Sequence, residues 1–112
     1  MDVKITQRRL VWEVNNDKCH NYYYLVLGRF YNEDHTRYRK FKFVEWFDIF
    51  DVMEYHDKDS VTKSDILEML NAHIDSRLSL IKGYDDCKEF YNSCSMSIAH
   101  YNDLVNAYNK NR

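Results

Sequence analysis

The segment Tyr22–Val44, YYYLVLGRFYNEDHTRYRKFKFV, decides the fold of this 112-residue chain. It contains two runs rich in aromatic and β-branched residues, Tyr22–Tyr31 and Arg37–Val44, with the polar stretch Asn32–Thr36 between them. Aromatic and β-branched residues favour strands, whereas a cluster of Asn, Asp and Thr favours a turn. The segment therefore predicts an antiparallel hairpin.

A further strand is predicted before this hairpin. Leu10, Trp12 and Val14 recur with the two-residue period of a strand, and the stretch 15–18, Asn-Asn-Asp-Lys, is typical of a tight turn. Residues 2–44 are therefore expected to form a three-stranded antiparallel β-meander.

The second half of the chain predicts helices. Thr62 followed by Asp65 is a variant of the capping box, so a helix is expected to begin at about Lys63. Apolar residues then follow the 3.6-residue period as far as Gly83, the expected left-handed C-terminal cap. The segment Glu45–His56 is ambiguous, because a helix gathers its aromatic residues in one arc but a continued strand also accounts for them. We favour the helix.

A heptad-like seam follows, in which apolar residues alternate spacings of four and three. In one interpretation, a long helix packs this seam antiparallel on the preceding helix; in the other, the seam pairs with a second copy of the chain as a homodimer. The expected fold is a single α+β domain over residues 1–112, with two or three helices packed on one face of the meander. The seam consists of Cys87, Tyr91, Cys94, Ile98, Tyr101, Val105 and Tyr108.

The composition excludes several classes of protein. Hydrophobic residues make up 45% of the chain, enough for a packed core, so a disordered chain is not expected. No apolar run approaches the roughly 20 residues that cross a bilayer, and the N-terminus lacks a signal segment, so a cytoplasmic location without membrane contact is expected. With two glycines and no common catalytic, nucleotide-binding or zinc motif, the chain is expected to be no enzyme and to bind no cofactor or metal.

The net charge of −2 conceals a division along the chain. Residues 1–44 contain nine Lys or Arg against five acidic residues, whereas residues 45–112 contain seven against thirteen. A folded chain with this division can present one basic and one acidic surface.

The second and third predicted strands interleave basic and aromatic residues: Tyr22, Tyr23, Tyr24, Arg29, Phe30 and Tyr31 in the second, and Arg37, Tyr38, Arg39, Lys40, Phe41 and Lys42 in the third. A sheet face of this kind can stack unpaired bases and hold their phosphates, as in single-stranded nucleic-acid-binding proteins. The simpler interpretation is a charged edge strand that discourages aggregation. The candidate nucleic-acid-binding residues are Arg37, Tyr38, Arg39, Lys40 and Lys42.

An acidic series with a spacing of three runs through the ambiguous segment. On a helix these carboxylates form a stripe of like charges on neighbouring turns, which weakens the helix by about a few tenths of a kcal/mol per pair. Removing the charges is therefore expected to leave stability unchanged or slightly raised. Such a stripe can occupy a basic nucleic-acid groove on another protein, although a solvated helix face has the same pattern. The candidate partner-binding residues are Glu45, Asp48, Asp51, Glu54 and Asp57.

In overall character the chain resembles the small anti-CRISPR and related anti-defence proteins of phages and plasmids. The likeness lies in one short domain, a tyrosine-rich composition typical of low-GC genomes, no catalytic motif and an acidic series beside aromatic residues. The resemblance implies an inhibitor that binds a host effector, such as a Cas nuclease complex, and blocks its nucleic-acid site through the acidic surface. The alternatives are direct single-stranded nucleic-acid binding and a structural protein that pairs through its C-terminal helix.

Overall fold

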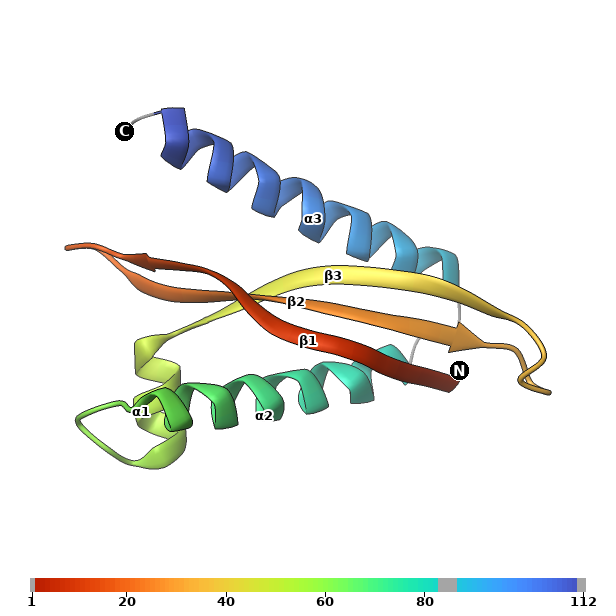
Figure 1. The fold of residues 1–112 in the computed structure, drawn as a ribbon, viewed down its shortest axis with the longest axis horizontal. Helices are drawn as coiled ribbons and strands as arrows, with labels where there is room; N and C mark the ends of the chain where they lie inside the picture. The colour runs from red at the N-terminus through yellow and green to blue at the C-terminus, as the bar shows by residue number, and fades with distance from the viewer. Residues whose placement is uncertain (1, 83–86, 111–112) are drawn as a thin grey trace.

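In the part of the chain that the structure describes, three strands are followed by three helices (Figure 1). The structure, a computed structural model, describes residues 2–82 and 87–110. The strands form one antiparallel sheet in the order β1-β2-β3, so the α+β class and the predicted meander are confirmed. None of the helices in the described ranges is long and apolar enough to cross a membrane. The elements are β1 (Asp2–Asn15), β2 (His20–Tyr31), β3 (Tyr38–Asp48), α1 (Ile49–His56), α2 (Lys63–Lys82) and α3 (Cys87–Lys110).

Asparagine side chains hold both turns of the meander. In the β1–β2 turn, Asn16 Oδ1 accepts hydrogen bonds from the backbone N–H groups of Lys18 (2.8 Å) and Cys19 (3.0 Å). In the β2–β3 loop, Asn32 Oδ1 accepts from the Arg37 N–H (3.0 Å). These short polar side chains accept hydrogen bonds from turn N–H groups that have no partner on a neighbouring strand. Because such bonds form between near neighbours in the chain, both turns could be predicted from the sequence.

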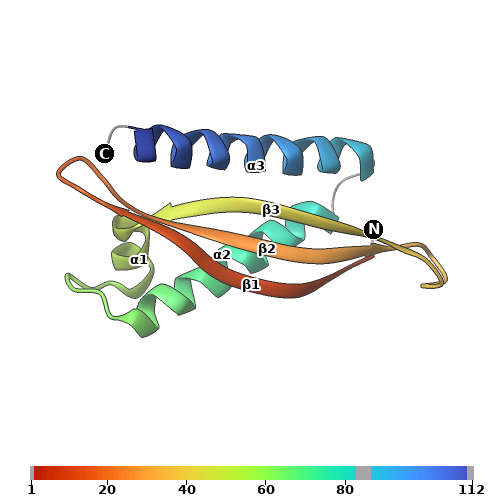
Figure 2. The ribbon, with the colours of Figure 1, turned by 45° about the horizontal axis from the view of Figure 1, so that its top comes forward.

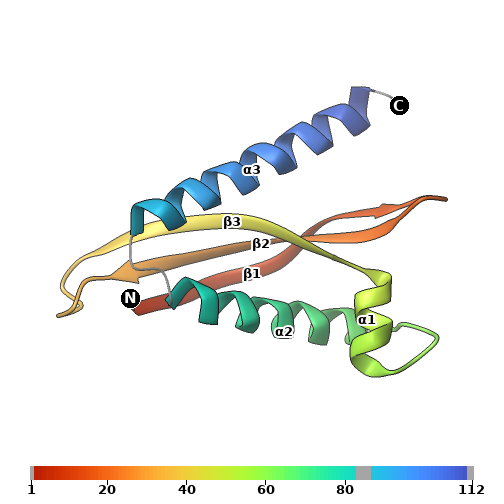
Figure 3. The ribbon, with the colours of Figure 1, turned by 180° about the vertical axis from the view of Figure 1, so that it is seen from behind.

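The helices divide between the two faces of the sheet, rather than gathering on one face as expected (Figures 1 and 3). Tyr24 contacts His73 of α2, whereas its neighbour Tyr23 packs against Tyr101 of α3, with ring centroids 6.0 Å apart. Both tyrosines are buried, although neighbours along a strand point to opposite faces. A central strand that is apolar on both faces needs a cover on each.

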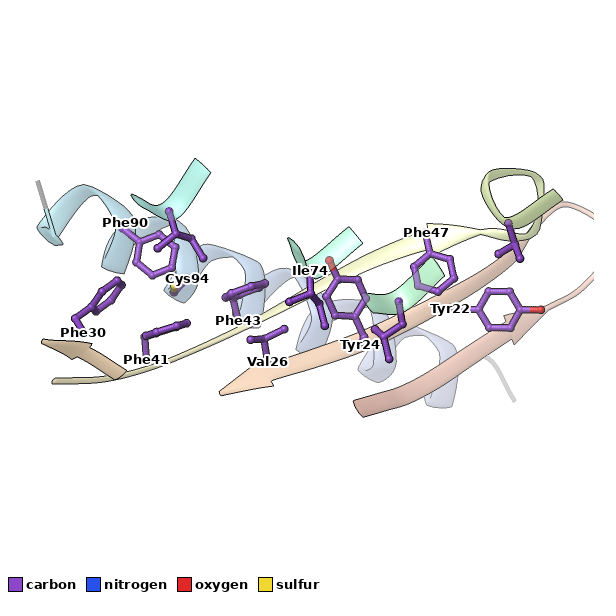
Figure 4. Packing of buried hydrophobic residues seen from close by; sticks show 13 residues of the cluster. Tyr22, Tyr24, Val26, Phe30, Phe41, Phe43, Phe47, Ile74, Phe90 and Cys94 are labelled. Carbon is purple, nitrogen blue, oxygen red and sulfur yellow. The ribbon is translucent and has the colours of Figure 1, made fainter. Parts of the chain in front are cut away.

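The core lies between the sheet and α2 and is built largely of aromatic rings (Figure 4). Tyr24 and Phe47 are fully buried beside Ile74 of α2. At the other end of the cluster, Phe90 of α3 meets Phe41 edge-on, with centroids 5.4 Å apart. The core therefore draws residues from strands and helices that are far apart in the sequence.

Helix α3 covers the outer edge of β3 (Figure 2). The Val44 N–H donates to Ser97 Oγ (3.2 Å), and the Tyr91 hydroxyl donates to the Lys40 carbonyl. Both β3 groups face away from β2, so α3 satisfies an edge that would otherwise be open to pairing. The seam thus packs on the sheet and not along α2: Tyr91 and Ser97 bond to the edge of β3, and Tyr101 packs against Tyr23 of β2. Pairing of two copies through the seam stays a prediction.

The start of α2 follows the predicted capping box. The Asp65 N–H donates to Thr62 Oγ1 (3.2 Å) and the Thr62 N–H donates to Asp65 Oδ2 (3.0 Å), and the helix begins at Lys63 as expected. The Gly83 cap lies outside the described residues. The prediction of one helix over residues 45–56 is wrong for its first four residues, which extend β3.

Gly28 of β2 gives room for an aromatic ring. A Cβ atom at this position would lie 2.3 Å from Cζ of Phe41 and 2.8 Å from the carbonyl oxygen of Lys4. The Phe41 ring therefore lies directly on the glycine backbone of the neighbouring strand, an arrangement that any side chain at this position excludes.

We expect Gly28→Ala to destabilise the protein by about 1–3 kcal/mol, because the added methyl group overpacks the core. The denaturant midpoint measures the change. Phe41→Ala and the double variant complete a mutant cycle, in which the two effects should be clearly non-additive if the ring causes the clash. An unchanged midpoint for Gly28→Ala contradicts the packing.

Candidate functional site

The five acidic residues do not form the helical stripe that their spacing predicted. Glu45 lies in β3, where its carboxylate pairs with the Arg77 guanidinium of α2 (3.2 Å). Asp48 is the N-cap of α1, and Asp57 is its C-cap, in the left-handed region at φ 54°. Only Asp51 and Glu54 lie within the helix. The strand continues to Asp48 because β3 stays paired with β2 up to that residue.

Two of the acids form a reciprocal capping box. The Asp51 N–H donates to Asp48 Oδ1 (2.8 Å), and the Asp48 N–H donates to Asp51 Oδ2 (2.9 Å). Carboxylates at this position satisfy free backbone donors and lie at the positive end of the helix dipole. Their charges therefore stabilise α1, contrary to the expectation that they weaken it.

The outward face of α1 combines exposed carboxylates with exposed aromatic rings. Its inward side is set by Val52, which is fully buried. Phe50 keeps 71% of its surface exposed and Tyr55 keeps 57%, which is unusual for such large apolar side chains. We call Phe50, Asp51, Glu54 and Tyr55 the acidic aromatic face; its two aromatic members were not among the predicted site residues.

The predicted basic residues separate onto different surfaces. Tyr38, Lys40 and Lys42 alternate along β3 and so share one face of the sheet. Arg39 points to the other face, with its guanidinium 4.3 Å from the centre of the Tyr91 ring. Arg37 precedes the strand, in the β2–β3 loop. The five residues therefore do not form one platform.

The strand register groups these lysines with Arg29, which belongs to the predicted interleaved strands, and with Lys4, which was not singled out from the sequence. Lys4 of β1 lies opposite Arg29 of β2, and Arg29 lies opposite Lys40 of β3. Residues directly opposite on neighbouring strands share a face. The signal was therefore present in the sequence, but only the register made it readable. We call Lys4, Arg29, Lys40 and Lys42 the basic row.

A groove lies between the face of the basic row and α3. Its volume is about 600 Å³, within the usual range of ligand sites. Lys40 and Lys42 line it from the sheet, and Leu27 contributes apolar surface. The helix contributes a further mixture of small, apolar and amide side chains: Tyr91, Cys94, Ser95, Ile98, Ala99 and Asn102.

A polar chain crosses the core beside Glu45. The Arg77 guanidinium that pairs with Glu45 also lies close to the Tyr24 hydroxyl, whose pKa it lowers, and this hydroxyl lies within hydrogen-bond distance of His73 Nδ1. Burial, and then the charge of Glu45, raise the pKa of Tyr24 above its usual value, so its hydroxyl keeps its proton. Burial, and then the charge of Arg77, lower the pKa of His73, while Asp51 opposes the shift.

One cluster in the described ranges has the composition of a metal site. His56, Asp65 and Glu68 place possible ligand atoms within 4.8 Å of one another. The Lys58 ammonium, however, donates to both Asp65 oxygens, at 3.0 and 3.1 Å. Hydrogen bonds from the Thr62 backbone and from Lys58 hold the pKa of Asp65 at about 2. Since a lysine already neutralises this carboxylate, the cluster is a helix-start network rather than a ligand set.

Comparison with known proteins gives no relative. No protein family matches the chain, and no curated protein or solved structure shows significant similarity to it. Function must therefore be argued from the two surfaces themselves.

The capping box predicts different effects for neighbouring acids. Asp48→Ala should lower stability by about 1 kcal/mol, because it removes the N-cap acceptor of α1. Glu54→Gln, which removes an exposed charge, should change stability by less than about 0.5 kcal/mol. Thermal unfolding of both variants measures the difference. Equal effects of the two substitutions contradict the assignment of Asp48 as the N-cap of α1.

The Tyr24–His73 contact predicts a loss of stability in mild acid. The pKa of His73 is lower in the folded state than in the unfolded chain, so the neutral imidazole favours folding. This stabilisation is complete above the unfolded pKa of about 6.5 and is lost as the pH falls from that value through the folded pKa. The melting temperature should therefore decline from pH 7 to pH 5. His73→Gln should flatten this decline, whereas the exposed control His100→Gln should keep it.

Proposed function

We propose that this chain is a non-catalytic binding protein that docks its acidic aromatic face into a basic nucleic-acid groove of a host effector. The observation that carries the proposal is the composition of that face, where the exposed acids Asp51 and Glu54 lie between the exposed rings of Phe50 and Tyr55. The effector class is a nucleic-acid-handling defence complex, such as a Cas nuclease, in the cytoplasm of the host.

The physical support is the combination of exposed aromatic rings with carboxylates beside them. Exposed aromatic side chains are the residues that most often dominate binding free energy once a partner buries them. Carboxylates at the rim repel nucleic acid and attract Lys and Arg, so they speed association with a basic groove and discriminate against other partners. Phe50 contributes little to folding at 71% exposure, which leaves its position open to a binding role.

The charge distribution gives a second support. Asp57 and Asp59 follow α1 directly and are exposed, so this end of the molecule stays acidic beyond the helix. The basic row lies on the sheet, on different elements. A partner with a positive groove is therefore attracted to the α1 end.

Purified, guide-RNA-loaded CRISPR nucleases from low-GC bacteria test the proposal, with cleavage of a target duplex as the readout. The wild-type protein should inhibit at least one nuclease at near-equimolar concentration and should compete with its nucleic acid. Phe50→Ala should weaken inhibition by about 30-fold or more, as expected for a buried anchor. Glu54→Gln should slow association and reduce its salt dependence.

Matched controls lie on α3. Met96 is 72% exposed, close to the value for Phe50, and Glu89 is an exposed acid, so Met96→Ala and Glu89→Gln test for general surface effects. Neither should alter inhibition. Lack of inhibition across the nucleases, or unchanged inhibition by the Phe50 variant, overturns the proposal.

A further inference from the structure

The basic row is an arrangement that folding alone does not favour. Lys4, Arg29 and Lys40 occupy directly opposed positions on three adjacent strands. Like charges in such positions repel and destabilise a sheet. Lys42 adds a fourth positive charge two residues along β3 on the same face.

Among the residues that the structure describes, no carboxylate neutralises the basic row. Within the described part of the chain, none of its four cationic groups lies within 4.0 Å of an acidic oxygen. The nearby acid Asp2 is instead paired with His35. The Arg29 guanidinium lies over the Tyr38 ring, 4.5 Å from its centre, and this contact orders the Arg29 side chain. The row therefore presents a positive surface in which the position of Arg29 is set by an aromatic ring.

The groove beside α3 begins where the basic row ends. Lys40 and Lys42 belong to both, so a ligand held by these cations lies at the mouth of the groove. Leu27 and Ile98 give the groove apolar surface, and the Asn102 side chain provides a hydrogen-bonding amide. Cations beside an apolar slot with polar groups match a phosphate backbone that carries unpaired bases.

We infer that this face binds single-stranded nucleic acid, with backbone phosphates on Lys4, Arg29, Lys40 and Lys42 and a base in the α3 groove. Helix α3 bounds one side of the groove, so a strand with splayed bases can enter, whereas a duplex offers only its backbone. This site is separate from the acidic aromatic face. Its test uses only the purified protein and an oligonucleotide, so either proposal can fail while the other stands.

The first experiment is fluorescence anisotropy with a labelled 15-nucleotide oligo(dT) between 50 and 200 mM salt. Each phosphate contact on a single strand contributes about −0.7 to the slope of log K against log salt, so four contacts give a slope near −3. Lys40→Gln with Lys42→Gln should reduce the slope by about 1.4 and weaken binding. Lys18→Gln with Lys63→Gln removes the same charge from exposed positions elsewhere and should leave the slope unchanged.

The second experiment tests the groove without touching the core. Ser95 is an exposed residue that lines the groove, and its neighbour Met96 is exposed but does not line it. Ser95→Glu should weaken oligo(dT) binding several-fold and Ser95→Lys should strengthen it. Met96→Glu and Met96→Lys change the same charge one residue away and should have much smaller effects.

Three results would overturn the inference. The first is no binding of oligo(dT) at 50 mM salt. The second is equal binding of oligo(dT) and a 15-base-pair duplex, with the same response to Ser95→Glu, which shows general attraction of polyanions. The third is equal effects of the Ser95 and Met96 substitutions. Melting curves of all variants confirm that each one is folded.

Discussion

Strand β2 is buried on both of its faces, and the remainder of the structure depends on this burial. Tyr22, Tyr23 and Tyr24 are all buried, although successive side chains of a strand point in opposite directions. Such a strand must be central, which the order β1-β2-β3 provides, and it must be covered on each side, which α2 and α3 provide. The two asparagine-rich turns keep β1 and β3 in register beside it. The hydrophobic effect on this one strand therefore fixes the placement of both long helices.

The same cover makes the candidate surfaces. Because α3 satisfies the edge of β3 through Tyr91 and Ser97, it stands beside the sheet and leaves a groove along the face that carries the basic row. Because β3 continues to Asp48 before the chain turns, α1 begins at the far end of the strand and turns its acidic aromatic face outward. The basic and acidic surfaces are thus on different elements, and the near-neutral net charge hides both.

The two candidate surfaces are identified more clearly by residues that do not stabilise the fold than by residue type alone. Glu45 and Asp48 have defined structural partners, so their charges are explained by folding, whereas Asp51 both closes the capping box of α1 and lies exposed on the acidic aromatic face. Phe50 stays largely exposed, so it adds little to the stability of the fold. The cations Lys4, Arg29 and Lys40 face one another on neighbouring strands, and their repulsion lowers that stability. Features of this kind persist when something other than the fold requires them, which is why both proposals rest on them.

The sequence by itself determined the local structure. The two-residue period of β1, the Asn and Asp turns and the Thr62–Asp65 capping box act between near neighbours, so their physics is readable from a short window. It did not determine that β3 runs to Asp48, that Gly28 accommodates the Phe41 ring, or that α3 packs on the sheet instead of on α2. Those outcomes depend on which apolar surfaces meet across many residues. The candidate sites divide in the same way: Lys40, Lys42, Asp51 and Glu54 were found from spacing, whereas their grouping with Lys4 and Arg29, or with Phe50 and Tyr55, was decided only by strand register and by the side of α1 that the core buries.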